Sequence, residues 1–371
     1  MKMTFCAPCI FGLEGLCANE FRFLGLENVR AENGRVLFDG DFSAMARANI
    51  NARYAERILI LMGEFRAVSF AQLFDGVRAL PWAEYIGMSD AFPVKGSCLN
   101  SKLMSVPDCQ KIVKKAVVQA LSERYMLSWF EETGALHQIQ FLIFNDRVSV
   151  LLDTSGAGLH KRGYRAQANE APIKETLAAA MAELAGVRPN HFVIDPMCGS
   201  GTILIEAAMK ALKIAPGLDR YFAAERWSCV PDKVFERERE AARAKIVRDC
   251  AFRAQGFDID PAALAVAKSN AEKAGVADRI TFEKRDINEL VLPEGYCTVI
   301  TNPPYGERLL DLKAAEALYK VMGERFPHAE GKRYAVITPD DDFEKLFGRK
   351  ADKRRKTYNG TLKCQIYLFS K

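Results

Sequence analysis

Short apolar segments alternate with amphipathic segments over the second half of the chain, from about residue 160. Short apolar runs are typical of buried strands, whereas apolar residues three and four positions apart predict helices. The expected strands are 192–194, 253–257, 280–284, 298–300, 334–337 and 364–369, and the expected helices are 173–184, 202–212, 261–274 and 312–326. Strands that alternate with helices in this way predict a doubly wound α/β sheet with mostly parallel strands.

The first half of the chain has a less regular pattern. Residues 16–24 and 109–125 have helical spacing, residues 137–144 and 147–153 have the composition of strands, and Asn33-Gly34 predicts a hairpin turn. This mixture is typical of compact α+β modules. We therefore expect three units, at residues 1–60, 61–155 and 160–371. We also expect an insertion at 211–250, with a helix at 232–248, to lie on the surface of the third unit.

Composition excludes several classes of protein. The chain has 371 residues, of which 49% are hydrophobic and 27% charged. No apolar run reaches about 18 residues and the N-terminus lacks the apolar stretch of a secretory signal, so we expect a cytoplasmic protein without a membrane segment. The ten cysteines are irregularly spaced, which favours reduced thiols. Cys6 and Cys9 form a CxxC pair, but no second pair follows, so we expect buried thiols and no metal.

Basic residues are concentrated in the second half. Residues 1–160 carry 16 Lys and Arg against 17 Asp and Glu, a net charge of −1, and residues 161–371 carry 36 against 30, a net charge of +6. The excess forms clusters at 160–165 and 349–356. Such clusters fit a polyanionic partner such as nucleic acid, although charged runs are also common on surfaces that bind nothing.

The first motif that indicates chemistry is Asp195-Pro-Met-Cys198-Gly199-Ser-Gly201-Thr202, between an expected strand and an expected helix. Ligands of doubly wound sheets bind at the carboxyl ends of strands, and glycines let a ligand approach the backbone. A P-loop would need a Gly-Lys pair, and a dinucleotide site would need a third glycine. With these two sites set aside, the motif favours an adenosine cofactor that has a cationic tail, which Asp195 could attract. S-adenosylmethionine (SAM) is such a cofactor. A structural tight turn is the alternative.

Acidic residues follow the next two expected strands. Asp258 can accept hydrogen bonds from both hydroxyls of a ribose, with Ile259 packed on the adenine. Asp260 precedes a proline and is expected to cap the next helix. Asp286 is a candidate partner for the adenine amino group. A turn or capping role is the alternative for Asp258 and for Asp286.

The stretch Asn302-Pro303-Pro304-Tyr305 follows an apolar strand, which the two prolines terminate. The Asn302 amide oxygen and the Pro303 carbonyl can accept hydrogen bonds from an exocyclic NH₂ group, which turns the nitrogen lone pair toward an incoming methyl group. Tyr305 can stack on the flat base. We assign Asn302, Pro303 and Tyr305 as catalytic, and Asn302 would also border the cofactor. A plain Pro-Pro turn is the alternative.

These motifs resemble class I SAM-dependent methyltransferases that act on exocyclic amines. The segments 8–14, 153–165, 171–178 and 358–364 extend the resemblance over essentially the whole chain. They are similar to bacterial THUMP-domain RNA methyltransferases, including 23S rRNA guanine-N2 methyltransferases that are often labelled N6-adenine-specific DNA methylases. The resemblance implies an α/β fold with a C-terminal Rossmann-like class I methyltransferase domain. It also implies an N-terminal α+β region, ferredoxin-like plus THUMP, that binds RNA.

The resemblance implies roles for individual residues as well. The glycine-loop residues Asp195, Cys198, Gly199, Gly201 and Thr202 would hold the methionine end of SAM, and Thr176 would line the cofactor. The basic residues implied as phosphate contacts are Lys161, Arg162 and Arg165, with an ordinary surface or linker role as the alternative.

We therefore expect a SAM-dependent enzyme that methylates an exocyclic amine of a base in RNA, with guanine N2 in 23S rRNA as the leading target. Adenine N6 in DNA or RNA is the alternative, because the Asn-Pro-Pro-Tyr stretch does not distinguish these substrates. A non-catalytic RNA-binding assembly factor would predict loss of Asn302 or Gly199, and both are present. Neither a membrane nor an obligate protein partner is expected.

Overall fold

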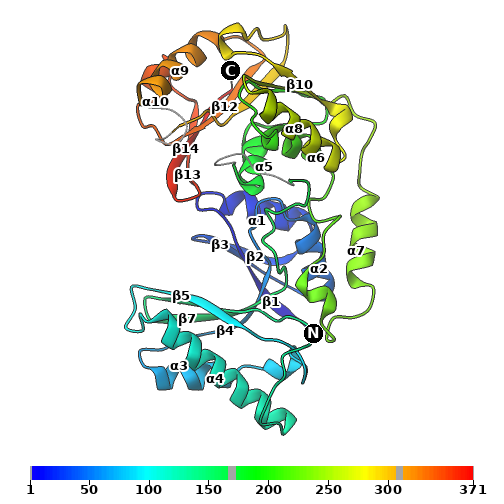
Figure 1. Cartoon of the computed structure of the whole chain (residues 1–371), viewed down its shortest axis with the longest axis vertical. Coiled ribbons are helices and arrows are strands. Elements are labelled where there is room, and N and C mark those ends of the chain that lie inside the picture. Colours follow the sequence, from blue (N-terminus) through cyan, green and yellow to red (C-terminus); the bar gives the residue numbers. More distant parts are fainter. Residues whose placement is uncertain (1, 166–172, 306–311, 371) are drawn as a thin grey trace.

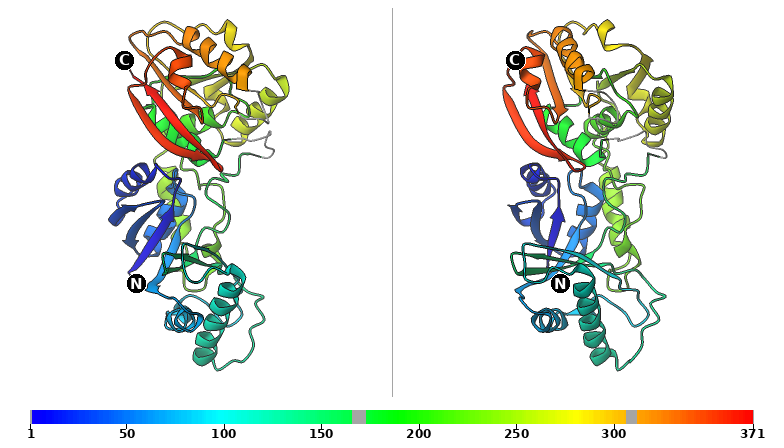
Figure 2. Two further views of the ribbon diagram at one scale, coloured as in Figure 1. Left: turned by 90° about the vertical axis from the view of Figure 1, so that its left-hand side faces the viewer. Right: turned by 60° about the vertical axis from the view of Figure 1, so that its left-hand side comes forward.

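The computed structural model describes residues 2–165, 173–305 and 312–370. The molecule is elongated, and its three units follow one another along the long axis (Figure 1). The second unit lies at one end, the first unit in the middle and the third unit at the other end, an order that Figure 2 shows from two further directions. The first unit therefore lies between the other two.

The first two units share one sheet. Their elements are β1 (Met3–Pro8), α1 (Glu14–Phe23), β2 (Glu27–Glu32), β3 (Arg35–Gly40), α2 (Phe42–Asn51), β4 (Leu59–Arg66), α3 (Phe70–Arg78), η1 (Trp82–Glu84), β5 (Val94–Leu99), α4 (Val106–Tyr125), β6 (Ile139–Phe144) and β7 (Arg147–Asp153). Within the described residues the strand order is β2-β3-β1-β4-β7-β6-β5. β4 pairs with β1 at Ile60 and with β7 along most of its length. The division expected between residues 60 and 61 thus falls inside a strand that both units use.

The third unit contains the expected doubly wound sheet. Its elements are α5 (Glu175–Leu184), β8 (Phe192–Asp195), α6 (Thr202–Ala211), η2 (Ala223–Arg226), α7 (Val234–Arg243), β9 (Arg253–Asp258), α8 (Pro261–Lys273), η3 (Ala277–Arg279), β10 (Ile280–Lys284), η4 (Ile287–Glu289), β11 (Cys297–Thr301), α9 (Leu312–Arg325), β12 (Lys332–Thr338), α10 (Phe343–Phe347), β13 (Lys353–Asn359) and β14 (Leu362–Phe369). The described strands lie in the order β10-β9-β8-β11-β12-β14-β13. The first five are parallel and the last two antiparallel. This topology confirms the predicted sheet.

The basic cluster at 349–356 has a structural explanation. Much of it belongs to β13, a strand at the edge of the sheet that the sequence pattern did not predict. Exposed charged residues are common on edge strands, because they discourage pairing with another chain. The cluster therefore combines an edge-strand role with its positive charge.

The insertion at 211–250 lies at the surface, as expected, but one face of it is covered by the first unit. Its helix α7 is shorter than predicted and packs on α2 of the first unit. The Arg47 guanidinium donates two hydrogen bonds of 3.0 Å to the Glu238 carboxylate of α7. The Gly217 N–H donates to the Ile50 carbonyl at 2.8 Å, and Phe235 is buried. The insertion thus joins the third unit to the first.

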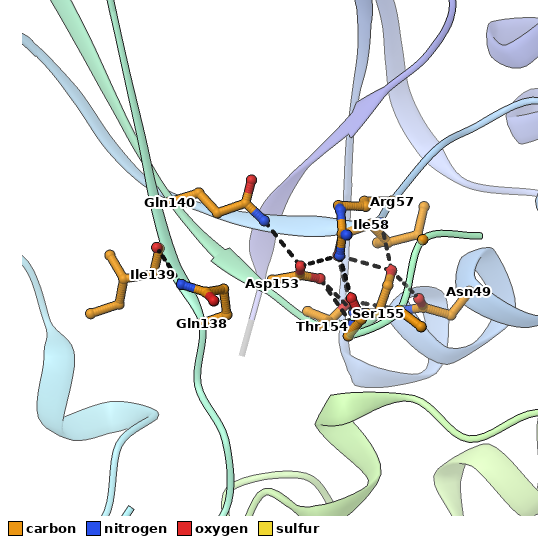
Figure 3. A network of polar contacts seen from close by, with 12 residues as sticks. Asn49, Arg57, Ile58, Gln138, Ile139, Gln140, Asp153, Thr154 and Ser155 are labelled. Carbon is orange, nitrogen blue, oxygen red and sulfur yellow. Dashed lines mark hydrogen bonds and ion pairs between the residues drawn. The ribbon is translucent and has the colours of Figure 1, made fainter. Parts of the chain in front are cut away.

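A buried polar network fixes the chain where it leaves the second unit (Figure 3). Asp153 accepts hydrogen bonds from the Ser155 N–H at 2.9 Å and from the Gln140 amide at 3.0 Å. The Ser155 hydroxyl donates to Asn49 of α2 at 2.6 Å, and Asn49 donates to the Thr154 hydroxyl at 2.9 Å. Because most of these groups are buried, the hydrogen bonds between them hold the first and second units in one orientation.

Three further findings concern features that the sequence raised. All ten cysteines are free thiols, and Cys6 and Cys9 are both buried. Over the described ranges, no helix is both long enough and apolar enough to cross a bilayer. The same part of the chain brings together no cluster of three or more His, Cys, Asp or Glu side chains suited to a metal ion.

Candidate active site

The glycine loop lies at the carboxyl end of β8 and leads into α6. Gly199 has a φ of +50°, and a Cβ built on it would meet no atom within 4 Å. The space beside its backbone is therefore open to a ligand, as predicted. Gly201 has a φ of +78°, and a Cβ there would lie 3.1 Å from both Ala267 and Phe282. Packing against α8 and β10, together with the left-handed backbone, explains this second glycine.

Asp258 lies at the carboxyl end of β9, directly beside the glycine loop. Its carboxylate accepts a hydrogen bond from the Gly199 N–H at 2.9 Å and another from the Asp260 N–H at 3.0 Å. Ile259 is exposed next to it, where it can cover a flat ring. Asp260 caps α8 by accepting from the Ala262 N–H at 2.9 Å, which confirms the predicted cap.

Asp195 ends β8 and is almost fully buried. Its carboxylate accepts a 3.2 Å hydrogen bond from the Met197 N–H. Burial raises the pKa of Asp195 to about 7, and the neighbouring Asp258 charge adds to this shift. A buried carboxylate without a cationic partner among the described residues is energetically costly, so the site favours a positively charged ligand group.

The other residues predicted around the cofactor make contacts inside the protein. The Cys198 N–H donates to the Phe257 carbonyl at 2.8 Å, which ties the loop to β9. The Thr202 hydroxyl accepts from Arg165 at 2.7 Å, and the Thr176 hydroxyl donates to Glu56 of the first unit at 2.6 Å. A direct role of these side chains toward SAM stays a prediction.

Asp286 follows β10, the strand next to β9, and is exposed. Its carboxylate caps η4 by accepting from the backbone and side-chain nitrogens of Asn288, each at 2.8 Å. The capping alternative is therefore present in the structure. A contact between Asp286 and adenine stays a prediction.

The catalytic stretch begins directly after β11, the strand next to β8. The Asn302 side-chain oxygen is buried and has no hydrogen-bond partner in the part of the chain that the structure describes. Pro303 is buried as well. A buried acceptor without a donor is costly in folded proteins, so this oxygen is available to a donor from a ligand. Residues 306–311, which complete the motif, lie outside the described residues.

Sequence reasoning missed a partner of Tyr305. The Asn359 side chain at the end of β13 donates a 2.6 Å hydrogen bond to the Tyr305 hydroxyl, which also lies 3.9 Å from the Cys364 sulfur of β14. Burial raises the pKa of the Tyr305 phenol, so it stays neutral. The β13–β14 hairpin thus fixes the ring of Tyr305, and the resemblance at 358–364 was the available signal.

The structure corrects part of the predicted phosphate site. Lys161 is exposed, but Arg162 is buried and donates at 2.6 Å to both the Leu159 and Arg53 carbonyls. It also pairs with the buried Glu206 carboxylate at 3.4 Å. The assignment of Arg162 as a phosphate contact is therefore wrong, because its guanidinium cannot reach solvent. Arg165, half-buried, directs its guanidinium to Thr202 and to the Ile173 carbonyl.

The geometry fits a SAM site. An open glycine backbone, a carboxylate at the end of the next strand and a buried carboxylate lie at the carboxyl edge of the sheet. Beside them lies an amide acceptor that has no partner within residues 2–165, 173–305 and 312–370. These are the groups that an adenosine cofactor with a cationic tail requires. The fold and site define a SAM-dependent methyltransferase.

Comparison with known proteins identifies the same class. A model of the RMKL-like methyltransferase domain matches residues 162–367. The RlmL ferredoxin-like domain matches residues 4–59, and the THUMP domain matches residues 67–153. The chain belongs to the family of methyltransferases that combine a THUMP domain with an RMKL-like methyltransferase domain. The predicted fold is thereby confirmed in all three of its parts.

Individual relatives agree with this assignment. The "Putative RNA methyltransferase YpsC" of Bacillus subtilis is 40% identical over 370 residues, which cover 99% of this chain and 96% of that protein. The "Ribosomal RNA large subunit methyltransferase K/L" of Psychromonas ingrahamii is 32% identical over 98% of this chain, which spans 50% of that protein. The solved structure of SMU.472, complexed with SAH, is 41% identical, with a TM-score of 0.94 over 100% of this chain and 98% of that one. The names of these relatives agree with the class that the fold and the site define.

Proposed function

We propose that the protein transfers a methyl group from SAM to an exocyclic amine of a base in RNA, with guanine N2 of 23S rRNA as the target. The observation that carries this proposal is the buried side-chain oxygen of Asn302, which has no hydrogen-bond partner among the described residues. It lies at the end of β11, beside the strand that leads into the glycine loop. An acceptor in this position can take a donor from the substrate, and an exocyclic NH₂ group is such a donor.

The chain's own groups would position the amine. The Asn302 oxygen and the Pro303 carbonyl would accept its two hydrogens, which directs the nitrogen lone pair away from both acceptors. Both groups would also stabilise the positive charge that develops on nitrogen as the new N–C bond forms. The amine is itself the nucleophile, so the catalytic task is largely positioning. Tyr305, fixed by Asn359, would stack on the base.

SAM supplies an electrophilic methyl group on its sulfonium sulfur. We assign its methionine end to the glycine loop and its ribose to Asp258, with Ile259 and Asp286 at the adenine. The open space at Gly199 and the buried carboxylate of Asp195 support this arrangement. Thr176 and Thr202 complete the proposed set from the helix ends behind the loop.

RNA as the substrate rests on the first two units. We propose that residues 1–60 and 61–155 bind RNA, that residues 160–371 carry out methyl transfer, and that Lys161 contacts phosphate at their junction. The THUMP match at 67–153 and the names of the two curated relatives support RNA over DNA. The name of the Psychromonas ingrahamii relative supports the large-subunit rRNA, although this chain spans half of that protein.

Transfer of tritium from labelled SAM tests the proposal. The wild-type protein is incubated with in vitro transcribed, unmodified 23S rRNA, with 16S rRNA as the matched control and with unmethylated duplex DNA. The label is then assigned by digestion to nucleosides. We expect N2-methylguanosine in 23S rRNA. Label in N6-methyladenosine would overturn the choice of base, and label confined to DNA would overturn the choice of RNA.

A further inference from the structure

Two segments far apart in the sequence meet at the junction between the first and third units. They are the loop 9–12, which follows β1, and the β13–β14 hairpin. A Cβ on Gly12 would lie 2.1 Å from the Lys356 carbonyl oxygen, and Gly12 has a φ of +87°. The Gly12 N–H donates to Glu14 at 2.9 Å, which fixes the loop from behind. Only glycine fits this close approach between the two units.

Two exposed aromatic rings lie at this contact. Phe11 of the loop is 50% exposed and Tyr358 of the hairpin is 40% exposed. Their ring centroids are 6.2 Å apart, with an interplanar angle of 75°. Both rings thus keep part of their surface open to solvent, and exposed aromatic side chains beside basic residues are the platforms on which unpaired bases stack.

The rings border a hollow of about 280 Å³. Its lining is Cys9, Ile10, Phe11, Glu56, Lys174, Tyr358 and Gly360. This volume lies just below the range typical of pockets for whole small molecules, so it suits one part of a polymer. Lys174 is partly exposed at its rim, and exposed basic side chains of β13 lie close by, including Lys356. The Glu56 carboxylate is engaged by Lys174 at 3.1 Å and by Thr176 at 2.6 Å, so its charge is matched within the protein.

The hollow is connected to the catalytic stretch through the hairpin. Asn359, whose side chain holds the Tyr305 hydroxyl at 2.6 Å, lies between Tyr358 and Gly360 of the hollow. The Thr176 hydroxyl, on the helix that follows Lys174, contacts Glu56 in the lining. A chain bound to the hollow would therefore lie on the same hairpin that orders the proposed target-base site.

We propose that the hollow binds an unpaired nucleotide of the RNA next to the target base, with its base on Phe11 and Tyr358 and its phosphate at the exposed basic side chains of β13. The inference rests on the proposed function, because it takes RNA as the substrate. It assigns the first unit a direct contact with the substrate beside the catalytic site. A base splayed out of a helix for methylation leaves its neighbours unstacked, and a stacking platform compensates for that loss.

Alanine variants of the two rings test the proposal. Affinity for in vitro transcribed, unmodified 23S rRNA, KM for that RNA and affinity for SAM are measured for Phe11→Ala and Tyr358→Ala. We expect each to weaken RNA binding by roughly 5- to 150-fold, as stacking energies imply, and to raise KM with SAM affinity unchanged. Phe11→Trp should retain wild-type affinity. The matched controls are Phe23→Ala and Tyr296→Ala, whose rings are 93% and 79% exposed elsewhere on the chain.

A second readout keeps the test decisive if a variant folds poorly. The wild-type protein is crosslinked by ultraviolet light to the same RNA containing 4-thiouridine, and the adducts are located by mass spectrometry. Adducts on residues 9–12 or 356–360 support the proposal. Wild-type RNA affinity in both alanine variants, or adducts confined to other segments, overturns it. If the wild-type protein methylates no RNA at all, the proposed function fails instead, and the two failures are thereby distinguished.

Discussion

The side-chain nitrogen of Asn359 lies 2.6 Å from the hydroxyl oxygen of Tyr305, so the last hairpin of the chain holds a residue of the catalytic stretch. This hydrogen bond joins two positions 54 residues apart in the sequence. It orients a ring that we assign to the target base. The orientation of Tyr305 should therefore depend on a residue that touches neither SAM nor the base.

Removal of the hydrogen bond between Asn359 and Tyr305 should slow methyl transfer without changing the affinity for SAM. A single neutral hydrogen bond contributes about 0.5–1.5 kcal/mol, so Asn359→Ala should lower kcat/KM for RNA by roughly 2- to 12-fold. Tyr305→Phe should have a similar effect, and the double variant should be no slower than either single variant, because all three lose the same bond. Single-turnover kinetics measures the rates and calorimetry the SAM affinity. Additive effects of the two substitutions would contradict the coupling.

Asn302→Ala should abolish measurable methyl transfer while SAM binds nearly as in the wild type. Loss of one preorganised group that stabilises developing charge costs about 10²–10³-fold in rate, and this variant also loses the group that orients the amine. Tritium transfer and calorimetry measure the two quantities. Asn19→Ala, an exposed asparagine on α1, is the matched control and should behave as wild type. Turnover at the wild-type rate in Asn302→Ala would refute the catalytic assignment.

Affinity for SAM should increase with pH up to about 7 and then level off. Burial raises the pKa of Asp195 to about 7, so the free protein carries a protonated, neutral Asp195 in mildly acidic solution. A cationic ligand prefers the carboxylate and must displace this proton, which costs up to about tenfold in affinity per pH unit below 7. Asp195→Asn should bind more weakly and without this pH dependence. Calorimetry at about pH 6, 7 and 8 measures the effect.

The same pKa has the opposite consequence for folding. Because folded Asp195 holds a proton that the unfolded chain releases near pH 4, this group's contribution to stability is greatest at low pH. That contribution is lost as the pH rises through about 7. Glu20 of the first unit, whose pKa burial also raises to about 7, shares this stability effect but lies outside the site. Glu20→Gln should therefore leave the pH dependence of SAM affinity unchanged, and a wild-type affinity independent of pH would contradict the role of Asp195.

The sequence was sufficient to predict that the residues we assign to the SAM site lie at one edge of the sheet, because each of them follows a strand. Asp195, Asp258 and Asn302 each follow a short apolar run, and parallel pairing brings the ends of β8, β9 and β11 to one edge. Local hydrophobic pattern and a general rule of sheet topology thus place residues that are far apart in sequence. The positive φ angles of Gly199 and Gly201 were likewise indicated by residue type alone, because glycine adopts them readily.

The contacts between units could not be predicted in this way. The pairing of Arg47 with Glu238 spans 191 positions, and the charged sequence of α7 predicts a surface helix without indicating that one of its faces packs on the first unit. Arg162 lies in a basic run, and only the fold shows that Glu206, 44 positions later, meets it in the interior. Which side of a charged segment is covered depends on the neighbouring unit, and local pattern carries no information about that neighbour.

Lys161 and Arg162 are adjacent cations with opposite surroundings, so their variants should separate RNA binding from stability. Arg162→Met removes one partner of a buried ion pair and leaves the Glu206 carboxylate uncompensated, which should lower the free energy of unfolding by about 3–5 kcal/mol. Lys161→Ala removes an exposed charge and should change stability by less than about 0.5 kcal/mol. It should instead weaken RNA binding. The slope of log affinity against log salt concentration should decrease by about one, as expected for the loss of one phosphate contact. Urea unfolding and RNA affinity at several salt concentrations measure both effects. Weakened RNA binding by Arg162→Met at unchanged stability would restore Arg162 as a phosphate contact.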